Sequence, residues 1–252
     1  MKLHVHEWGD PGAPPLICLH GVTGHGKRFR RLAEEHWAQR FHVIAPDLRG
    51  HGRSNWEPPW TYPTYVDDLV ETADALGIVE ADWVGHSFGG RLVLELAAAH
   101  PERVRRAVLL DPAIHVLPHI ALQNAEHQLA DPVYASTEEY ADRRADGPMT
   151  PRALVLEDAE QHCERLPDGR LRRRTCQPAI VSIYGEIATG PPPPETLRAP
   201  TLLIYAPAYG LVNEEQLAAY SGRAEIVEVP GMHMVMWDAF DEVAGAVDRF
   251  LT

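Results

Sequence analysis

Short, continuously apolar runs alternate with amphipathic helical patterns along the first half of this 252-residue chain. Each run is bounded by glycine, proline or aspartate, and the four clearest are LICLHG (16–21), FHVIAPD (41–47), ADWVGHS (81–87) and RAVLLDP (106–112). A strand that is apolar along its whole length is buried on both faces, and strands separated by helices form βαβ units. The alternation therefore predicts an α/β protein whose parallel sheet is covered by helices on both faces.

The strand pattern stops between about residues 113 and 198, where helix-like segments rich in His, Glu and Arg replace it. This stretch ends in GPPPPETLRAP (190–200), whose four consecutive prolines fit neither a helix interior nor a central strand. The sheet pattern then resumes with TLLIYA (201–206). We expect a core of residues 1–112 and 199–252, and a helical cap of residues 113–198 that covers the site and sets substrate shape.

The composition excludes several classes of partner. A formal net charge of −13, from 36 acidic and 23 basic residues, opposes binding to nucleic acid. No apolar run approaches the ~20 residues that span a bilayer, and the N-terminus alternates like a strand, so we expect a soluble, cytoplasmic protein without a membrane partner. The three cysteines, Cys18, Cys163 and Cys176, lack the paired spacing of zinc sites. We expect reduced thiols, no metal and no cofactor.

The segment Gly85-His86-Ser87-Phe88-Gly89 fits the pattern G-x-S-x-G. In a sharp strand-to-helix turn the serine backbone is strained, and side chains two residues to either side would collide, which explains the glycines. A strand-like run precedes Ser87 and a helical pattern follows it, so its Oγ would stand at a helix N-terminus above the carboxyl edge of the sheet. We predict that Ser87 is a nucleophile; the alternative is a glycine-rich turn with an incidental serine.

Four motifs, in this order, resemble those of the α/β-hydrolase family: LHG (19–21), DLRGHGRS (47–54), GHSFGG (85–90) and PGMHMVMWD (230–238). The resemblance covers nearly all of the chain except the insertion, and it implies a doubly wound, mostly parallel sheet of eight strands with an inserted helical cap. It also implies that backbone N–H groups of Val22 and Phe88 stabilise an oxyanion and that His233 takes the proton of Ser87. The glycine-rich loop GVTGHG agrees, because it can bring an amide against a helix N-terminus.

A catalytic serine–histidine pair normally needs a carboxylate that orients the histidine, and this chain has no acidic residue at the usual position for it. In most of the family the acid follows the strand equivalent to TLLIYA, but here residues 207–210 are Pro-Ala-Tyr-Gly, and tyrosine carries no negative charge at neutral pH. Asp111 ends the strand-like run RAVLLD, and some relatives, haloalkane dehalogenases among them, place the acid there. Neighbouring parallel strands deliver their carboxyl ends to one crevice, so Asp111 can reach His233.

Other roles for these acids stay open. Asp111 is alternatively the start of the connection to the cap. Asp47 is a second candidate acid, although its motif is typical of a loop whose aspartate binds backbone amides. Glu214 and Glu215 follow Asn213 in a pattern typical of a helix cap with acids in its first turn.

These residues together predict a serine hydrolase that cleaves small carboxylic esters or lactones through an acyl-enzyme intermediate. In this scheme Ser87 attacks, His233 carries the proton, and Asp111 orients the imidazole. Serine as the nucleophile argues against epoxide hydrolase and haloalkane dehalogenase chemistry, whose relatives use aspartate. C–C bond hydrolysis, cofactor-free perhydrolysis and a non-catalytic ligand-binding role stay open. The sequence specifies neither the substrate nor the oligomeric state.

Overall fold

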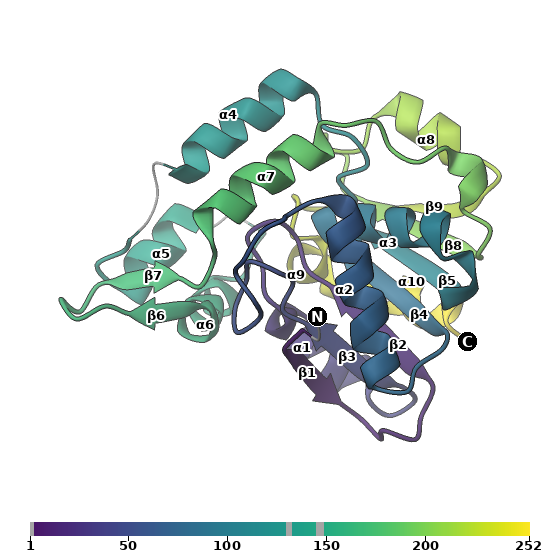
Figure 1. The fold of residues 1–252 in the computed structure, drawn as a ribbon, viewed down its shortest axis with the longest axis horizontal. Helices are drawn as coiled ribbons and strands as arrows, with labels where there is room; N and C mark the ends of the chain where they lie inside the picture. Colours follow the sequence, from purple (N-terminus) through teal and green to yellow (C-terminus); the bar gives the residue numbers. More distant parts are fainter. Residues whose placement is uncertain (1–2, 130–132, 145–148) are drawn as a thin grey trace.

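A mostly parallel sheet of seven strands forms the centre of the computed structural model, which describes residues 3–129, 133–144 and 149–252 (Figure 1). The strands lie in the order β1-β3-β2-β4-β5-β8-β9, in which β1 pairs antiparallel with β3 and every other neighbour is parallel. Their bounds are β1 Val5–Trp8, β2 Pro15–Leu19, β3 His42–Pro46, β4 Ala81–His86, β5 Val104–Leu110, β8 Thr201–Tyr205 and β9 Ala224–Glu228. The predicted α/β architecture is confirmed.

The number of strands differs from the eight that the family resemblance implied. The described residues before Val5 are not part of the sheet. The backbone N–H groups described there are engaged elsewhere: Leu3 donates to Thr72 Oγ1 and His4 donates to Ser54 Oγ, each at 2.9 Å. Within the described part of the chain, β1 is an edge strand of the sheet.

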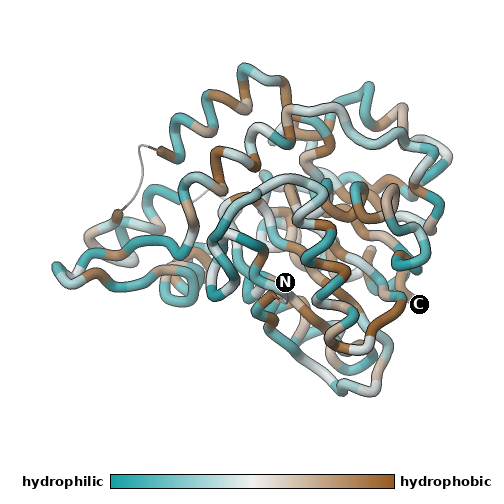
Figure 2. The backbone as a smooth tube through the Cα atoms, in the orientation of Figure 1, coloured by the Kyte–Doolittle hydropathy of each residue, from teal (hydrophilic) through white to brown (hydrophobic). Residues whose placement is uncertain are grey.

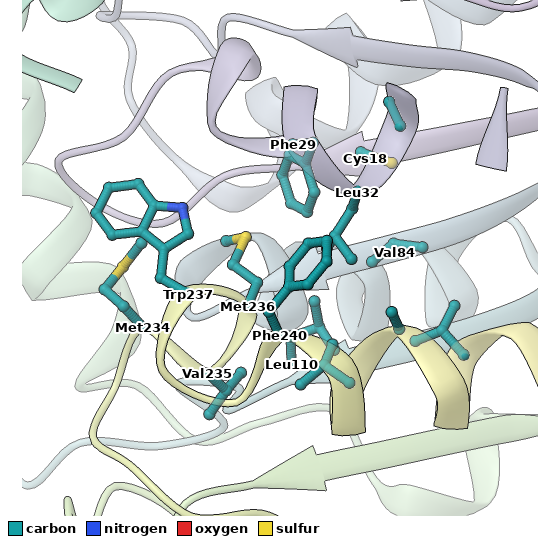
Figure 3. Packing of buried hydrophobic residues seen from close by; sticks show 14 of the residues in the cluster. Cys18, Phe29, Leu32, Val84, Leu110, Met234, Val235, Met236, Trp237 and Phe240 are labelled. Atoms are coloured by element: carbon teal, nitrogen blue, oxygen red, sulfur yellow. The ribbon is translucent and has the colours of Figure 1, made fainter. Parts of the chain in front are cut away.

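Alternate strand residues face two separate hydrophobic cores. Cys18 and Val84 lie in the core that packs against α1 (Arg30–Leu32), α9 (Val235–Asp238) and α10 (Phe240–Phe250), part of which Figure 3 shows. Leu19 and Trp83 lie in the opposite core, against α2 (Tyr62–Ala75) and α3 (Phe88–Ala99). The sheet is thus doubly wound, as predicted. The remaining elements of the core are η1 Gly26–Phe29, η2 Ala33–Trp37, η3 Pro101–Arg103 and α8 Glu214–Tyr220.

Between β5 and β8 the chain leaves the sheet, and we call residues 113–198 the insertion. It contains four α-helices, one short 3₁₀ helix and one small antiparallel sheet within its described residues: α4 Pro118–Leu129, α5 Thr137–Arg144, α6 Arg152–His162, β6 Cys163–Arg165, β7 Leu171–Arg173, α7 Gln177–Ile187 and η4 Pro194–Thr196. In Figure 1, α4 and α7 run side by side above one end of the sheet, and α5 lies near α6. The chain around β6 and β7 is largely hydrophilic (Figure 2), consistent with its exposed position. None of the helices described is both long and apolar enough to cross a membrane.

Candidate active site

Ser87 occupies a strained turn between β4 and α3. Its backbone has φ 56° and ψ −118°, a conformation that costs a non-glycine residue about 1–3 kcal/mol. A Cβ on Gly85 would lie 2.3 Å from the Gly89 carbonyl oxygen, and one on Gly89 would lie 2.1 Å from the Leu19 carbonyl oxygen. Both positions therefore require glycine, as the motif predicted.

Asp111 follows β5 directly, and its backbone also has a positive φ. Ser87 and Asp111, with φ 56° and 40°, are the two non-glycine residues of positive φ in the described chain. The Asp111 side chain is 0% exposed, and its N–H donates to the Ile204 carbonyl oxygen of β8 at 2.7 Å. Strain of this kind persists where the surroundings fix it, and it concentrates at functional sites.

His233 lies in the loop after β9 and joins the other two residues. Its Nδ1–H donates to Asp111 Oδ2 at 2.6 Å, and its Nε2 lies 2.9 Å from Ser87 Oγ. The second carboxylate oxygen of Asp111 accepts the Ala206 N–H at 3.2 Å. The structure therefore brings together the three residues predicted as nucleophile, base and acid. Because the imidazole proton is on Nδ1, Nε2 carries no proton and can accept the proton of Ser87.

A second histidine supports the backbone of the first. His86 Nε2–H donates to the His233 carbonyl oxygen at 2.9 Å. Complete burial, with His233 adjacent, lowers the pKa of His86 well below its ordinary value. His86 is thus a neutral donor that helps to orient His233.

The loop after β8 presents an aromatic ring where most of the family has the acid. The Tyr209 ring stacks on the His233 imidazole, with centroids 4.6 Å apart and planes 13° apart. Glu214 and Glu215 are exposed in the first turn of α8, where Asn213 and Gln216 form a capping box. The interpretation of this segment as a helix cap is confirmed.

Asp47, the other candidate acid, shapes a loop away from Ser87. Its carboxylate accepts N–H groups of Gly26 and Arg53 at 2.9 and 3.1 Å, and His6 Nε2 at 3.1 Å. Burial alone would raise the pKa of Asp47, but these hydrogen bonds hold it far below the usual range. The carboxylate is therefore occupied by the backbone amides that the sequence motif predicted.

Within the described residues, His4, His6 and Asp47 form the one group of three side chains whose ligand atoms, all within 4.8 Å of one another, could hold a metal ion. Binding a metal there would require His6 to give up its hydrogen bond to Asp47. These residues do not line the cavity at Ser87, so such an ion would not touch the reacting atoms.

The two predicted oxyanion donors belong to segments that lie next to Ser87. Phe88 is the first residue of α3, where a backbone N–H has no acceptor within the helix. Val22 is in the loop after β2, which approaches so closely that a Cβ on Gly21 would lie 3.0 Å from Ser87 Cβ. His20 Nδ1–H donates to the Gly21 carbonyl oxygen at 2.8 Å and helps to hold this loop. That Val22 and Phe88 bind an oxyanion stays a prediction.

A cavity of about 490 Å³ opens onto Ser87 and His233. Its size is typical of a pocket for a small molecule. Much of its wall comes from the insertion, which supplies both apolar and polar side chains: Val116, Ile120, Asn124, His127, Gln128, Tyr140, Arg143, Arg144, Val155, Asp158, Tyr184 and Ile187. Sequence reasoning missed these residues, because they fall in helical segments without a motif.

Similarity to known proteins agrees with this geometry. Residues 14–240 match the family described as alpha/beta hydrolase fold. The chain is 36% identical over 256 residues to the lipase LipV of Mycobacterium tuberculosis, covering 98% of this chain and 97% of that protein. It is 44% identical over 111 residues to the 2-hydroxymuconate semialdehyde hydrolase of a Pseudomonas species, covering 41% and 38%. The solved structure of E-2-(acetamidomethylene)succinate hydrolase matches it with a TM-score of 0.86 and 25% identity, over 99% of this chain and 94% of that one. This chain is therefore a hydrolase that belongs to the alpha/beta hydrolase fold family.

Proposed function

We propose that this protein is a serine hydrolase that cleaves small carboxylic esters or lactones. The observation that carries the proposal is the hydrogen-bonded series from Asp111 through His233 to Ser87, with heavy-atom distances of 2.6 and 2.9 Å. A hydroxyl within hydrogen-bond reach of a base, itself oriented by a buried carboxylate, is the arrangement that activates a serine.

The reaction follows from these contacts. Ser87 Oγ attacks the carbonyl carbon while its proton moves to His233 Nε2, and the imidazolium is stabilised by Asp111. The N–H groups of Val22 and Phe88 bind the oxyanion. Collapse of the tetrahedral intermediate expels the alcohol, which takes the proton from His233, and leaves an acyl-enzyme. Water, deprotonated by His233, then releases the acid and restores Ser87.

The ester preference is supported by the relative that matches over the whole chain, whose name is lipase. Cleavage of a C–C bond is the second candidate, favoured by the 2-hydroxymuconate semialdehyde hydrolase that matches over less than half of the chain. The two candidates share the same nucleophile and differ in the bond that breaks.

A hydrolysis screen tests the proposal. Aryl esters with short and long acyl chains, lactones and a vinylogous 1,5-diketone would be offered to the protein, with release of phenol, ring opening or loss of the dienol chromophore as the readout. We expect turnover of an ester or a lactone, no turnover by Ser87→Ala, and a covalent fluorophosphonate adduct on Ser87. A parent protein that is folded but neither labelled nor active would instead support a non-catalytic ligand-binding role.

A further inference from the structure

The loop that carries Val22 is tied to the insertion by a buried carboxylate. We call residues 20–29, between β2 and α1, the β2–α1 loop. His25 of this loop donates Nε2–H to Asp158 Oδ1 at 2.9 Å. Arg28 donates from Nε to Oδ1 at 2.8 Å and from Nη2 to Oδ2 at 3.0 Å. Asp158 belongs to α6 of the insertion, so one side chain joins two segments that are 133 residues apart at His25.

Asp158 is ionised and almost completely enclosed. Its side chain is 3% exposed, and Tyr140 O–H donates a further hydrogen bond to Oδ2 at 2.5 Å. Burial alone would raise the pKa of Asp158, but Arg28 and His25 outweigh it and hold the pKa well below the usual range. A buried carboxylate with four hydrogen bonds is rigid, and removing its charge takes away the ion pair and weakens the hydrogen bonds that hold Arg28 to α6.

Further contacts hold the same loop from the insertion and from the core. Arg144 of α5 donates from Nη2 to Thr23 Oγ1 at 2.8 Å, one residue from Val22. On the side of the core, His51 Nε2–H donates to the Val22 carbonyl oxygen at 2.6 Å, and Asp47 accepts the Gly26 N–H. The peptide of Val22 therefore lies between anchors from two parts of the chain.

We infer that Asp158 is a positioning residue for hydrolysis: from the insertion it fixes His25 and Arg28, and through them the N–H of Val22 that we propose binds the oxyanion. The inference rests on the proposed function of Ser87. It gives the insertion a part in the chemical step, in addition to setting the shape of the cavity. Asp158 does not donate or accept a proton in the reaction; it acts through the loop.

The expected consequence of losing this anchor is a slower chemical step. The oxyanion exists in the tetrahedral intermediate and not in the bound ester, so a displaced Val22 N–H lowers kcat more than it raises KM. One oxyanion donor is worth about 10²–10³ in kcat, and a misplaced donor keeps part of that. For Asp158→Asn we expect kcat to fall by roughly 10- to 100-fold, with KM within about threefold of the parent.

The experiment measures kcat, KM and the inhibition constant of a trifluoromethyl ketone for the parent and for Asp158→Asn. The ketone forms a tetrahedral adduct with an oxyanion, so its affinity should weaken in parallel with kcat/KM. The matched control is Glu157→Gln, because Glu157 is the next residue on α6 and accepts Arg30 Nε across the same boundary at 3.0 Å, with both side chains about one third exposed. We expect this control to keep the parent kcat.

A second variant keeps the test decisive if Asp158→Asn does not fold. His25→Phe keeps an aromatic ring beside His162, on which His25 stacks at 4.8 Å, and removes one hydrogen bond to Asp158. We expect a smaller fall in kcat, of several fold, with KM unchanged. Folded variants with the parent kcat and the parent ketone affinity would overturn the inference while leaving Ser87 as nucleophile. A parent protein without esterase activity or labelling would overturn the proposed function itself.

Discussion

The loops that follow β5 and β8, two neighbouring strands, meet the same imidazole in different ways. After β5 stands Asp111, which is 0% exposed, has a left-handed backbone, and accepts hydrogen bonds on both carboxylate oxygens. After β8 stand residues 207–210, which are exposed, and Tyr209 among them is 44% exposed. Asp111 contacts the edge of the His233 ring at Nδ1, whereas Tyr209 covers its face.

The difference bears on where a carboxylate can stand to reach His233 in this fold. Adjacent parallel strands open into one crevice, so a carboxylate at the end of either can reach the same nitrogen. The loop after β8 still contacts Asp111, because the N–H of Ala206 donates to Asp111 Oδ1. We infer that the requirement is for a buried carboxylate within reach of Nδ1, and that its place in the chain is secondary.

The largest expected effect comes from removing the charge on the β5 side. Asp111→Asn should lower kcat by up to about 10⁴-fold, because an amide neither stabilises the imidazolium nor holds the correct tautomer. Steady-state kinetics on the best ester measures this, with thermal unfolding to verify the fold. The control on the β8 side is Glu214→Gln, at an exposed helix end, which should stay within about twofold because only a helix dipole contact changes. If Asp111→Asn stays within a few fold while Glu214→Gln or Asp47→Asn collapses activity, the comparison assigns the acid to the wrong residue.

Three buried histidines should also make the fold sensitive to acid. Burial lowers the pKa of His20, His86 and His162 well below the ordinary value, so these rings stay neutral in the folded protein. In the unfolded chain each takes up a proton as the pH falls through about 6.5, which stabilises the unfolded state. The free energy of unfolding should therefore fall below about pH 6.5, by up to about 1.4 kcal/mol per pH unit for each ring.

Denaturant titrations at about pH 7.5 and about pH 5.5 measure this loss. The informative variant is His162→Phe, which is neutral at every pH and replaces a ring whose nitrogens have no hydrogen-bond partner among the described residues. In this variant the free energy of unfolding should change less between the two pH values, by the amount that one buried histidine contributes. The carboxyl groups of Asp47 and Asp158 have lowered pKa values in the folded protein. Their contribution to the free energy of unfolding is lost only as the pH falls below about 3.8, so they do not affect the comparison of these two pH values. An unchanged free energy of unfolding between the two pH values would show that these rings are not buried as neutral groups.

A smaller effect should come from the ring on the β8 side. Tyr209→Phe keeps the stacked ring and should leave kcat within about twofold, whereas Tyr209→Ala removes it and should lower kcat by a few fold, since aromatic contacts of this kind contribute about 0.5–1.5 kcal/mol. The comparison of the two variants separates the ring from the hydroxyl. A loss in Tyr209→Phe as large as that in Tyr209→Ala would mean that the hydroxyl takes part in catalysis.

Local patterns were enough to predict much of this site. The turn at Ser87 is encoded by five consecutive residues and its flanking strand and helix, so the sequence alone predicted the strand, the turn and the helix that the structure shows there. The pairing of Asp111 with His233 could be predicted because it needs only the rule that parallel strands end at one edge. The catalytic use of this geometry stays a prediction.

Other features were beyond local reasoning. Leu3 and His4, just before β1, donate their N–H groups to side-chain oxygens, and no periodic pattern in the sequence signals such contacts. The contact of Asp158 with His25 joins positions 133 residues apart, and α6 carries no motif that singles out this carboxylate. Contacts of this kind follow from the packing of the insertion, which the sequence pattern described only as helical.

The most direct test of the central claim, that Asp111 acts on Ser87 through His233, is a double-mutant cycle between Asp111→Asn and His233→Ala. The rate of Ser87 labelling by a fluorophosphonate is measured in the parent, both single variants and the double variant. We expect Asp111→Asn to slow labelling by several orders of magnitude in the parent but by no more than about threefold when His233 is already alanine, because residues that act as a unit are not additive. Equal slowing in both backgrounds would contradict the account, since Asp111 would then affect Ser87 without the imidazole.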